Sequence, residues 1–234
     1  MSDTPPVSPG PAPSPLVAVA FCPHPPSLLP TSGGAPAPGT GALRSACEEA
    51  LHTVLTAGPD VVLVVGDGPA GVRYGAGDSA DLAPWGGEGR VAFAGRVRPG
   101  GRPLPLGHAV AAGLLDRAGH AGTRLGVAPD DLATALSDLP GPVVVLAMGD
   151  GSPAAVARAL AAGDPAALAA PAAREAGRGP ATGADTWQAV GRVLTDRPVT
   201  ARLLHGSADV EDGHLVADWL VAPVPDRIPG WVTR

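Results

Sequence analysis

The chain has 234 residues, of which 45% are hydrophobic and 16% charged, and its formal net charge is -6. This composition predicts a globular protein with a sizeable core and excludes a chain that is disordered throughout. The acidic balance and the scattered arginines give no support to nucleic-acid binding. Cys22 and Cys47 are the only cysteines and lack the CxxC spacing, which argues against a zinc knuckle or a disulfide framework.

The first 15 residues, rich in proline and serine, are expected to form a disordered arm. They lack the basic segment of a signal peptide, and the apolar run that follows, Leu16 to Cys22, is too short to span a membrane. We therefore expect a cytoplasmic protein with no membrane partner.

The run "LVAVAF" (16–21) is continuously apolar and predicts a strand buried on both faces. Residues 42–57 place apolar side chains at helical spacing. "VVLVVGDG" then predicts a second buried strand that ends in glycines. Strand, helix and strand at these lengths predict a βαβ unit, with the two strands as parallel neighbours.

A long glycine-rich loop without clear periodicity is expected over 69–89, a length typical of binding loops or lids. A weaker strand at 90–97 follows. The next expected elements are a helix near 107–119, a strand at 123–128, a short helix at 130–137 and the buried strand within "PVVVLAMGDGSP" (142–153).

Two short helices broken near Gly163 and Pro165 are expected within 153–178, and a further helix over 186–196. The last part predicts an antiparallel hairpin with an Asp-Gly turn around Glu211. Together the elements predict a three-layer α/β fold, with a mostly parallel sheet and an antiparallel C-terminal hairpin. We expect one domain over 16–222, followed by a tail at 223–234.

Polar residues follow three of the predicted strands: His24, Asp67 and Asp150. In open α/β sheets, ligands bind beyond the carboxyl ends of the strands. A histidine and two carboxylates at that edge could hold a divalent metal. The alternative is structural: His24 would sit in a proline turn, and both aspartates would be turn residues or helix caps. Ser152 before Pro153 is an equally good cap.

Several other chemistries find no support. The chain has no lysine, so a Walker-type phosphate loop is excluded, and no GxSxG motif follows a strand. Cys22 lies two residues before His24, but its place at the end of a buried strand favours an inert core thiol over a nucleophile.

The sequence resembles the class III extradiol ring-cleavage dioxygenase superfamily in its subunit-B-like branch, and more narrowly small actinobacterial proteins with such a domain. The matching segments anchor most of the chain from about 16 to 222. They are "AFCPHPPSLLP" (20–30), "PDVVLVVGDG" (59–68), "VVLAMGDGS" (144–152), "AAGDPAAL" (161–168) and "GHLVADWLV" (213–221).

The resemblance implies a non-haem Fe(II) cofactor held by two histidines and a carboxylate, with a catecholic substrate bound to the iron. His24 matches the first metal histidine. The turn that holds the family's second metal histidine has Asp67 between two glycines and no histidine. The loop expected to carry the acid/base histidine has Asp150 and Ser152 instead, which become candidate substrate contacts. Glu211 is the counterpart of the carboxylate ligand.

The other five histidines lack the local context of the family's ligands, and His52 and His108 fall on predicted helices. Because only one of the family's four functional positions matches, we favour a degenerate, non-catalytic member of the family. It would bind a small molecule or a protein partner at the crevice beyond the strand ends. The sequence is also compatible with a homo-oligomer. The alternative is an Fe(II)-dependent extradiol dioxygenase with His24, Asp67 and Glu211 as ligands. A phosphate-binding protein is disfavoured, because an aspartate in each glycine loop would repel phosphate.

Overall fold

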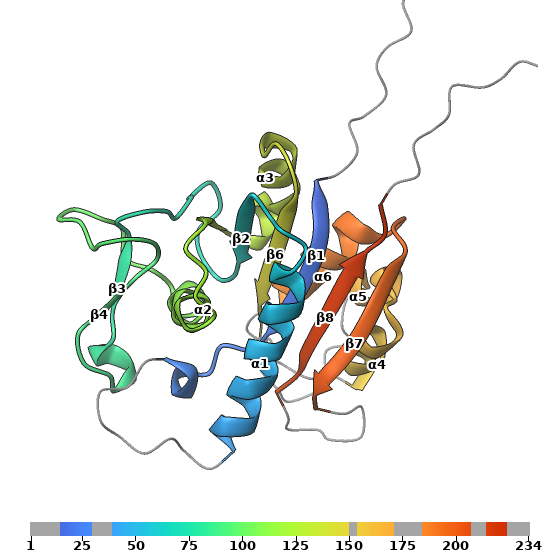
Figure 1. The fold of residues 1–234 in the computed structure, drawn as a ribbon, viewed down its shortest axis with the longest axis horizontal. Coiled ribbons are helices and arrows are strands. Elements are labelled where there is room, and N and C mark those ends of the chain that lie inside the picture. Colours follow the sequence, from blue (N-terminus) through green and yellow to red (C-terminus); the bar gives the residue numbers. More distant parts are fainter. Residues whose placement is uncertain (1–14, 30–38, 150–153, 171–183, 207–213, 224–234) are drawn as a thin grey trace, which may run out of the picture.

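The computed structural model describes residues 15–29, 39–149, 154–170, 184–206 and 214–223. Residues 1–14 of the predicted arm (1–15), residues 224–234 of the predicted tail and the predicted turn around Glu211 lie outside the described residues. The fold class is the one predicted from the sequence: helices cover a six-stranded, mostly parallel sheet that ends in an antiparallel hairpin (Figure 1).

The sheet has the strand order β5-β2-β6-β1-β8-β7. The four parallel strands are β1 (Leu16–Cys22), β2 (Val61–Val65), β5 (Thr123–Val127) and β6 (Val143–Met148). The hairpin consists of β7 (Val199–His205) and β8 (Val216–Val221), and β8 pairs antiparallel with β1. Strands β1, β2 and β6 are apolar along their whole length because helices cover both of their faces.

One prediction about the sheet is wrong. Strands β1 and β2 are parallel, but they are not neighbours, because β6 pairs with both of them. The connection between β1 and β2 leaves a space of one strand between them in the sheet, and β6 occupies this space. Hydrophobic periodicity identifies a buried strand but carries no information on its place in the sheet.

Two helices cover one face of the sheet: α1 (Thr40–Leu55) and α2 (Leu106–Arg117). Four cover the other face: α3 (Leu132–Asp138), α4 (Ala154–Ala162), α5 (Pro165–Ala169) and α6 (Ala184–Leu194). Single 3₁₀ turns are formed by η1 (Pro26–Leu28), η2 (Ala83–Trp85) and η3 (Pro129–Asp131). Among the described residues, no helix has the length and apolar character needed to cross a membrane.

Residues 66–105, between β2 and α2, leave the sheet and form a separate lobe, which we call the excursion (Figure 1). It contains a two-stranded ribbon of β3 (Ser79–Asp81) and β4 (Arg90–Ala92). The loop expected at 69–89 therefore includes a strand, and the strand expected at 90–97 is only three residues long. Glycines on both sides of the ribbon end the pairing early.

Gly191 gives a first testable prediction, because α5 and α6 touch at this residue. A Cβ there would lie 2.5 Å from the backbone nitrogen of Ala169 and 2.7 Å from the backbone oxygen of Pro165. We expect Gly191→Ala to lower the free energy of unfolding by about 1–3 kcal/mol, since backbone atoms cannot move aside as side chains do. Urea denaturation measures the change. Gly41→Ala is the matched control in α1: its Cβ would meet no atom within 4 Å, so the same substitution should not destabilise. Equal effects at both glycines would contradict the prediction.

Candidate functional site

The carboxyl ends of β1, β6 and β2 lie side by side, because these parallel strands are consecutive in the sheet. His24 follows β1 and Asp67 follows β2, so the sheet brings both to the same edge. A backbone hydrogen bond from the Gly149 nitrogen to the Cys22 oxygen (3.0 Å) continues the pairing to this edge. The structure thus brings His24 and Asp67 together, whereas Asp150, the third residue expected here, lies outside the described residues.

His24 is held in place by the proline turn that the sequence suggested. Pro25 is extended and precedes η1, and the Leu28 nitrogen donates to its carbonyl oxygen at 3.0 Å. The imidazole is only 3% exposed. Its Nε2 atom lies 3.6 Å from Oδ2 of Asp67, whose side chain is half-exposed. The two groups therefore form an ion pair when His24 is protonated, with its outer member open to solvent.

Asp67 begins no helix, since the next regular element after β2 is the strand β3. The helix-cap alternative for this residue is therefore wrong, and its carboxylate is left to face His24. The other candidates from the sequence, Asp150, Ser152 and Glu211, lie outside the described residues.

The first turn of α2 packs directly against this edge through Gly107. A Cβ on Gly107 would lie 3.3 Å from Cβ of Met148, 3.8 Å from Cγ of His24 and 3.9 Å from Cα of Gly66. Gly107 thus lies where three segments meet: the end of β6, the end of β2 and the loop that carries His24. Because α2 begins here, the backbone N–H groups of its first turn, which have no partner within the helix, lie close to His24.

His108 is the next residue of α2, and nothing in the sequence indicated that it belongs to the site. It is fully buried behind the Gly66 turn, with its ring 4.7 Å from that of Tyr74 and 6.1 Å from that of Phe93. Neither ring nitrogen makes a hydrogen bond to the described part of the chain. One signal could have found it: α2 is apolar on all sides, so a histidine within it must be buried.

Burial lowers the pKa of His108 to about 4. The backbone groups of Val127 and Asp67 act weakly in the opposite direction, and the nearby His24 lowers the pKa further. His108 is therefore neutral at pH 7. It supports the edge from behind without adding charge to it.

Tyr74, the only tyrosine, connects the excursion to this edge. Its backbone pairs with Gly126 of β5, through hydrogen bonds of 2.8 and 2.9 Å. Its hydroxyl oxygen lies 3.3 Å from the position of a Cβ on Gly68, next to Asp67. Burial raises the pKa of Tyr74, against the opposing effect of Arg102, so the hydroxyl stays protonated and can donate a hydrogen bond.

The described residues do not complete a metal site. His24 and Asp67 supply two donor atoms at a separation that one ion could bridge, given bonds of roughly 2.0–2.2 Å. A facial triad needs three ligands. No group of three histidine, cysteine or acidic side chains among the described residues is arranged to hold a metal ion. The residues present therefore fit only part of the Fe(II) site that the resemblance implies.

Cys22 lies just before this site but is not available to it. The thiol is fully buried, and a hydrogen bond with Cys47, burial and the charge of Asp218 raise its pKa well above the usual value. A thiol held protonated is a poor nucleophile, which agrees with the inert role inferred from the sequence.

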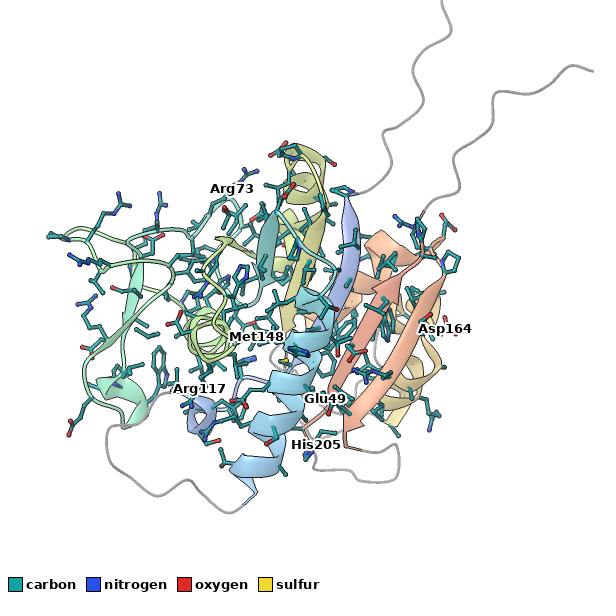
Figure 2. All side chains as sticks on the ribbon, viewed as in Figure 1. Glu49, Arg73, Arg117, Met148, Asp164 and His205 are labelled. Carbon is teal, nitrogen blue, oxygen red and sulfur yellow. The ribbon has the colours of Figure 1, made fainter. Side chains whose placement is uncertain are left out.

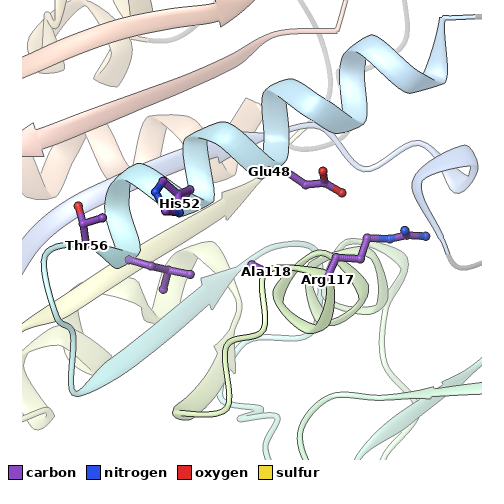
Figure 3. A pocket seen from close by; sticks show the side chains of 6 residues that line it. Glu48, His52, Thr56, Arg117 and Ala118 are labelled. Atoms are coloured by element: carbon purple, nitrogen blue, oxygen red, sulfur yellow. The ribbon is translucent and has the colours of Figure 1, made fainter.

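A hollow of about 440 Å³ lies away from this edge, between α1 and α2 (Figure 3). Its lining includes Glu48 and His52 from α1 and Arg117 from the last turn of α2. The strand-end site is at the other end of α2, beside its first turn. None of the residues predicted to form the site lines this hollow.

Neither the comparison with known protein families nor the search of curated proteins finds a match to this chain.

Proposed function

We propose that this protein is a cytoplasmic, non-catalytic member of the subunit-B-like fold that binds a small hydroxylated molecule at the strand-end edge. The pair of His24 and Asp67 carries the proposal. A hydroxyl group between Nε2 and Oδ2 can accept a hydrogen bond from the imidazole and donate one to the carboxylate, in place of the 3.6 Å ion pair.

Neighbouring groups support this ligand class. The Tyr74 hydroxyl beside Gly68 offers one further donor, and the half-buried Leu106 adds apolar surface next to Gly107. Small-molecule sites combine apolar walls with a few polar groups in this way. Cys22 and Cys47 are both free thiols, which supports a reducing compartment.

Ligand-observed NMR with a library of small alcohols, sugars and phenols in the presence of EDTA tests the proposal. We expect a subset to bind the wild-type protein without metal. That binding should weaken about tenfold or more in His24→Ala and in Asp67→Ala, since each variant removes one hydrogen bond to the ligand. His52→Ala, in the last turn of α1, is the matched control and should bind as wild type does. Binding that is unchanged in His24→Ala would overturn the proposal.

The alternative, an Fe(II)-dependent extradiol dioxygenase, is favoured by one observation: the two donor atoms at 3.6 Å could share an ion. Anaerobic equilibrium dialysis with Fe(II) separates it from the proposal. One-to-one binding that His24→Ala abolishes, followed by ring opening of a catechol in air, would establish the enzyme. Hydroxylated ligands that bind equally with and without Fe(II) would support the non-catalytic function.

A further inference from the structure

The distribution of charge along the chain points to a second functional surface, on the excursion. Residues 89–115 contain four arginines and neither aspartate nor glutamate, although the chain as a whole carries a net charge of -6. Three of these arginines, Arg96, Arg98 and Arg102, fall within seven residues. We call them, together with Val97, the arginine patch.

The guanidinium groups of this patch have no acidic partner in the described part of the chain. Arg98 donates to the backbone oxygen of Ala76 at 2.6 Å, and Arg102 donates to that of Arg73 at 3.0 Å. Three other arginines do have an acidic partner: Arg73 binds Asp138 at 2.5 Å, Arg124 binds Asp116 at 2.7 Å and Arg202 binds Asp218 at 2.5 Å. A guanidinium has five donor N–H bonds, so each of these two arginines keeps most of them for another molecule.

The backbone that carries the patch is tied down. The carboxylate of the buried Asp78 accepts hydrogen bonds from the nitrogens of Gly75 and Arg102, both at 2.8 Å. The Arg98 nitrogen donates to the Gly77 oxygen at 3.1 Å, and the Arg98 side chain crosses Gly77 where a Cβ would be. Gly77 has φ of 94°, which only glycine adopts without strain. Arg98 and Arg102 are thus held by a fixed backbone, which lowers the loss of conformational entropy when a partner binds.

Val97 distinguishes a protein partner from a simple anion. It is 40% exposed and is one of only two large hydrophobic side chains exposed among the described residues. It lies between Arg96 and Arg98, both exposed. An inorganic anion or a sugar phosphate would gain nothing from the isopropyl group. An acidic segment with an apolar side chain would use both the charges and the valine.

We propose that the arginine patch docks an acidic segment of a partner protein, with Val97 receiving an apolar side chain of that segment. The patch lies on the lobe that projects from the sheet, where nitrogen-tipped side chains point outward (Figure 2). The patch contains neither His24 nor Asp67, and Arg102 is its member near the strand-end edge, where its charge opposes the rise that burial causes in the pKa of Tyr74.

Fluorescence anisotropy with a labelled peptide of six glutamates and two leucines tests the proposal in the full chain. We expect binding at 50 mM salt that weakens as salt is added. Reversal of all three charges (Arg96→Glu, Arg98→Glu and Arg102→Glu) should weaken it about tenfold or more, and Val97→Ser about threefold. Replacing the three arginines by glutamine keeps donors for the loop carbonyls, and it should weaken binding in the same direction with the fold intact by circular dichroism.

The matched control reverses three exposed arginines outside the excursion, namely Arg117, Arg158 and Arg192, with the same change in net charge. It should leave binding within about twofold, because exposed charges beyond a Debye length are screened. Three outcomes would overturn the proposal: no binding tighter than about 1 mM, equal loss in the control variant, or full displacement by tripolyphosphate with no effect of Val97→Ser. The last would identify a plain anion site.

Discussion

We expect Arg202→Met to lower the free energy of unfolding by about 2–3 kcal/mol, as measured by urea denaturation at pH 7. Asp218 of β8 is only 1% exposed and lies opposite Arg202 of β7. The guanidinium binds both carboxylate oxygens: Nε is 3.1 Å from Oδ1 and Nη2 is 2.5 Å from Oδ2. Without Arg202 the carboxylate stays buried and loses its counter-charge. Because the Arg202 side chain is 45% exposed, water replaces part of what is lost, which keeps the effect moderate.

Arg202 also joins the hairpin to α1, through Oγ1 of Thr53 (2.7 Å) and Oε1 of Glu49 (3.4 Å). The outer contact is exposed, so Glu49→Gln should cost less than about 0.5 kcal/mol and is the matched control. The double variant Arg202→Met and Asp218→Leu should recover most of the lost stability, because it removes the buried charge together with its partner. A double variant as unstable as Arg202→Met alone would show that packing, and not the unpaired carboxylate, causes the loss.

The parts of the fold that follow from local pattern could be predicted from the sequence. The short, valine-rich apolar runs that became β1, β2 and β6 favoured buried strands, and the Asp-Gly segment before β8 indicated a hairpin. The place of β6 between β1 and β2 could not be predicted, because it depends on which strand fills the gap left by α1. The structure of the excursion could not be predicted either. Its shape depends on Asp78, whose carboxylate accepts hydrogen bonds from the backbone of Gly75 nearby and of Arg102, 24 residues later in the chain.

For the candidate site, the same division holds. His24 and Asp67 were predicted because parallel strands align their carboxyl ends, a rule that needs only the strand boundaries. His108 was missed because its position comes from α2 packing over the Gly66 turn, 42 residues earlier in the chain. A histidine in the first turn of a helix has no distinct sequence motif. Its burial follows only from the apolar character of the rest of α2.

The pH dependence of stability gives the second prediction with a large effect, and it depends on His108. An unfolded chain protonates this histidine below pH 6.5, whereas the folded chain does so only near pH 4. Between these values the unfolded state binds more protons, so stability falls as pH falls and stays fully present above pH 6.5. The shift corresponds to a loss of about 2.5 kcal/mol at pH 4.5 relative to pH 7.5. The first turn of α2 opposes protonation in the same direction, since a helix N-terminus repels a cation.

Urea denaturation of wild type and His108→Leu at pH 7.5 and 4.5 isolates this contribution. Leucine is apolar and close in size to histidine, so the variant should keep the buried contacts with Tyr74 and Phe93. Between pH 7.5 and 4.5, its free energy of unfolding should fall by about 2.5 kcal/mol less than that of wild type. His120, whose pKa burial and Arg124 also lower, contributes to the remaining slope in both proteins. His52→Leu, at an exposed position of α1, should leave the wild-type slope unchanged. Parallel stability curves for wild type and His108→Leu would mean that the imidazole is protonated in the folded state. A positive charge on His108 would then lie directly behind the edge that holds His24 and Asp67.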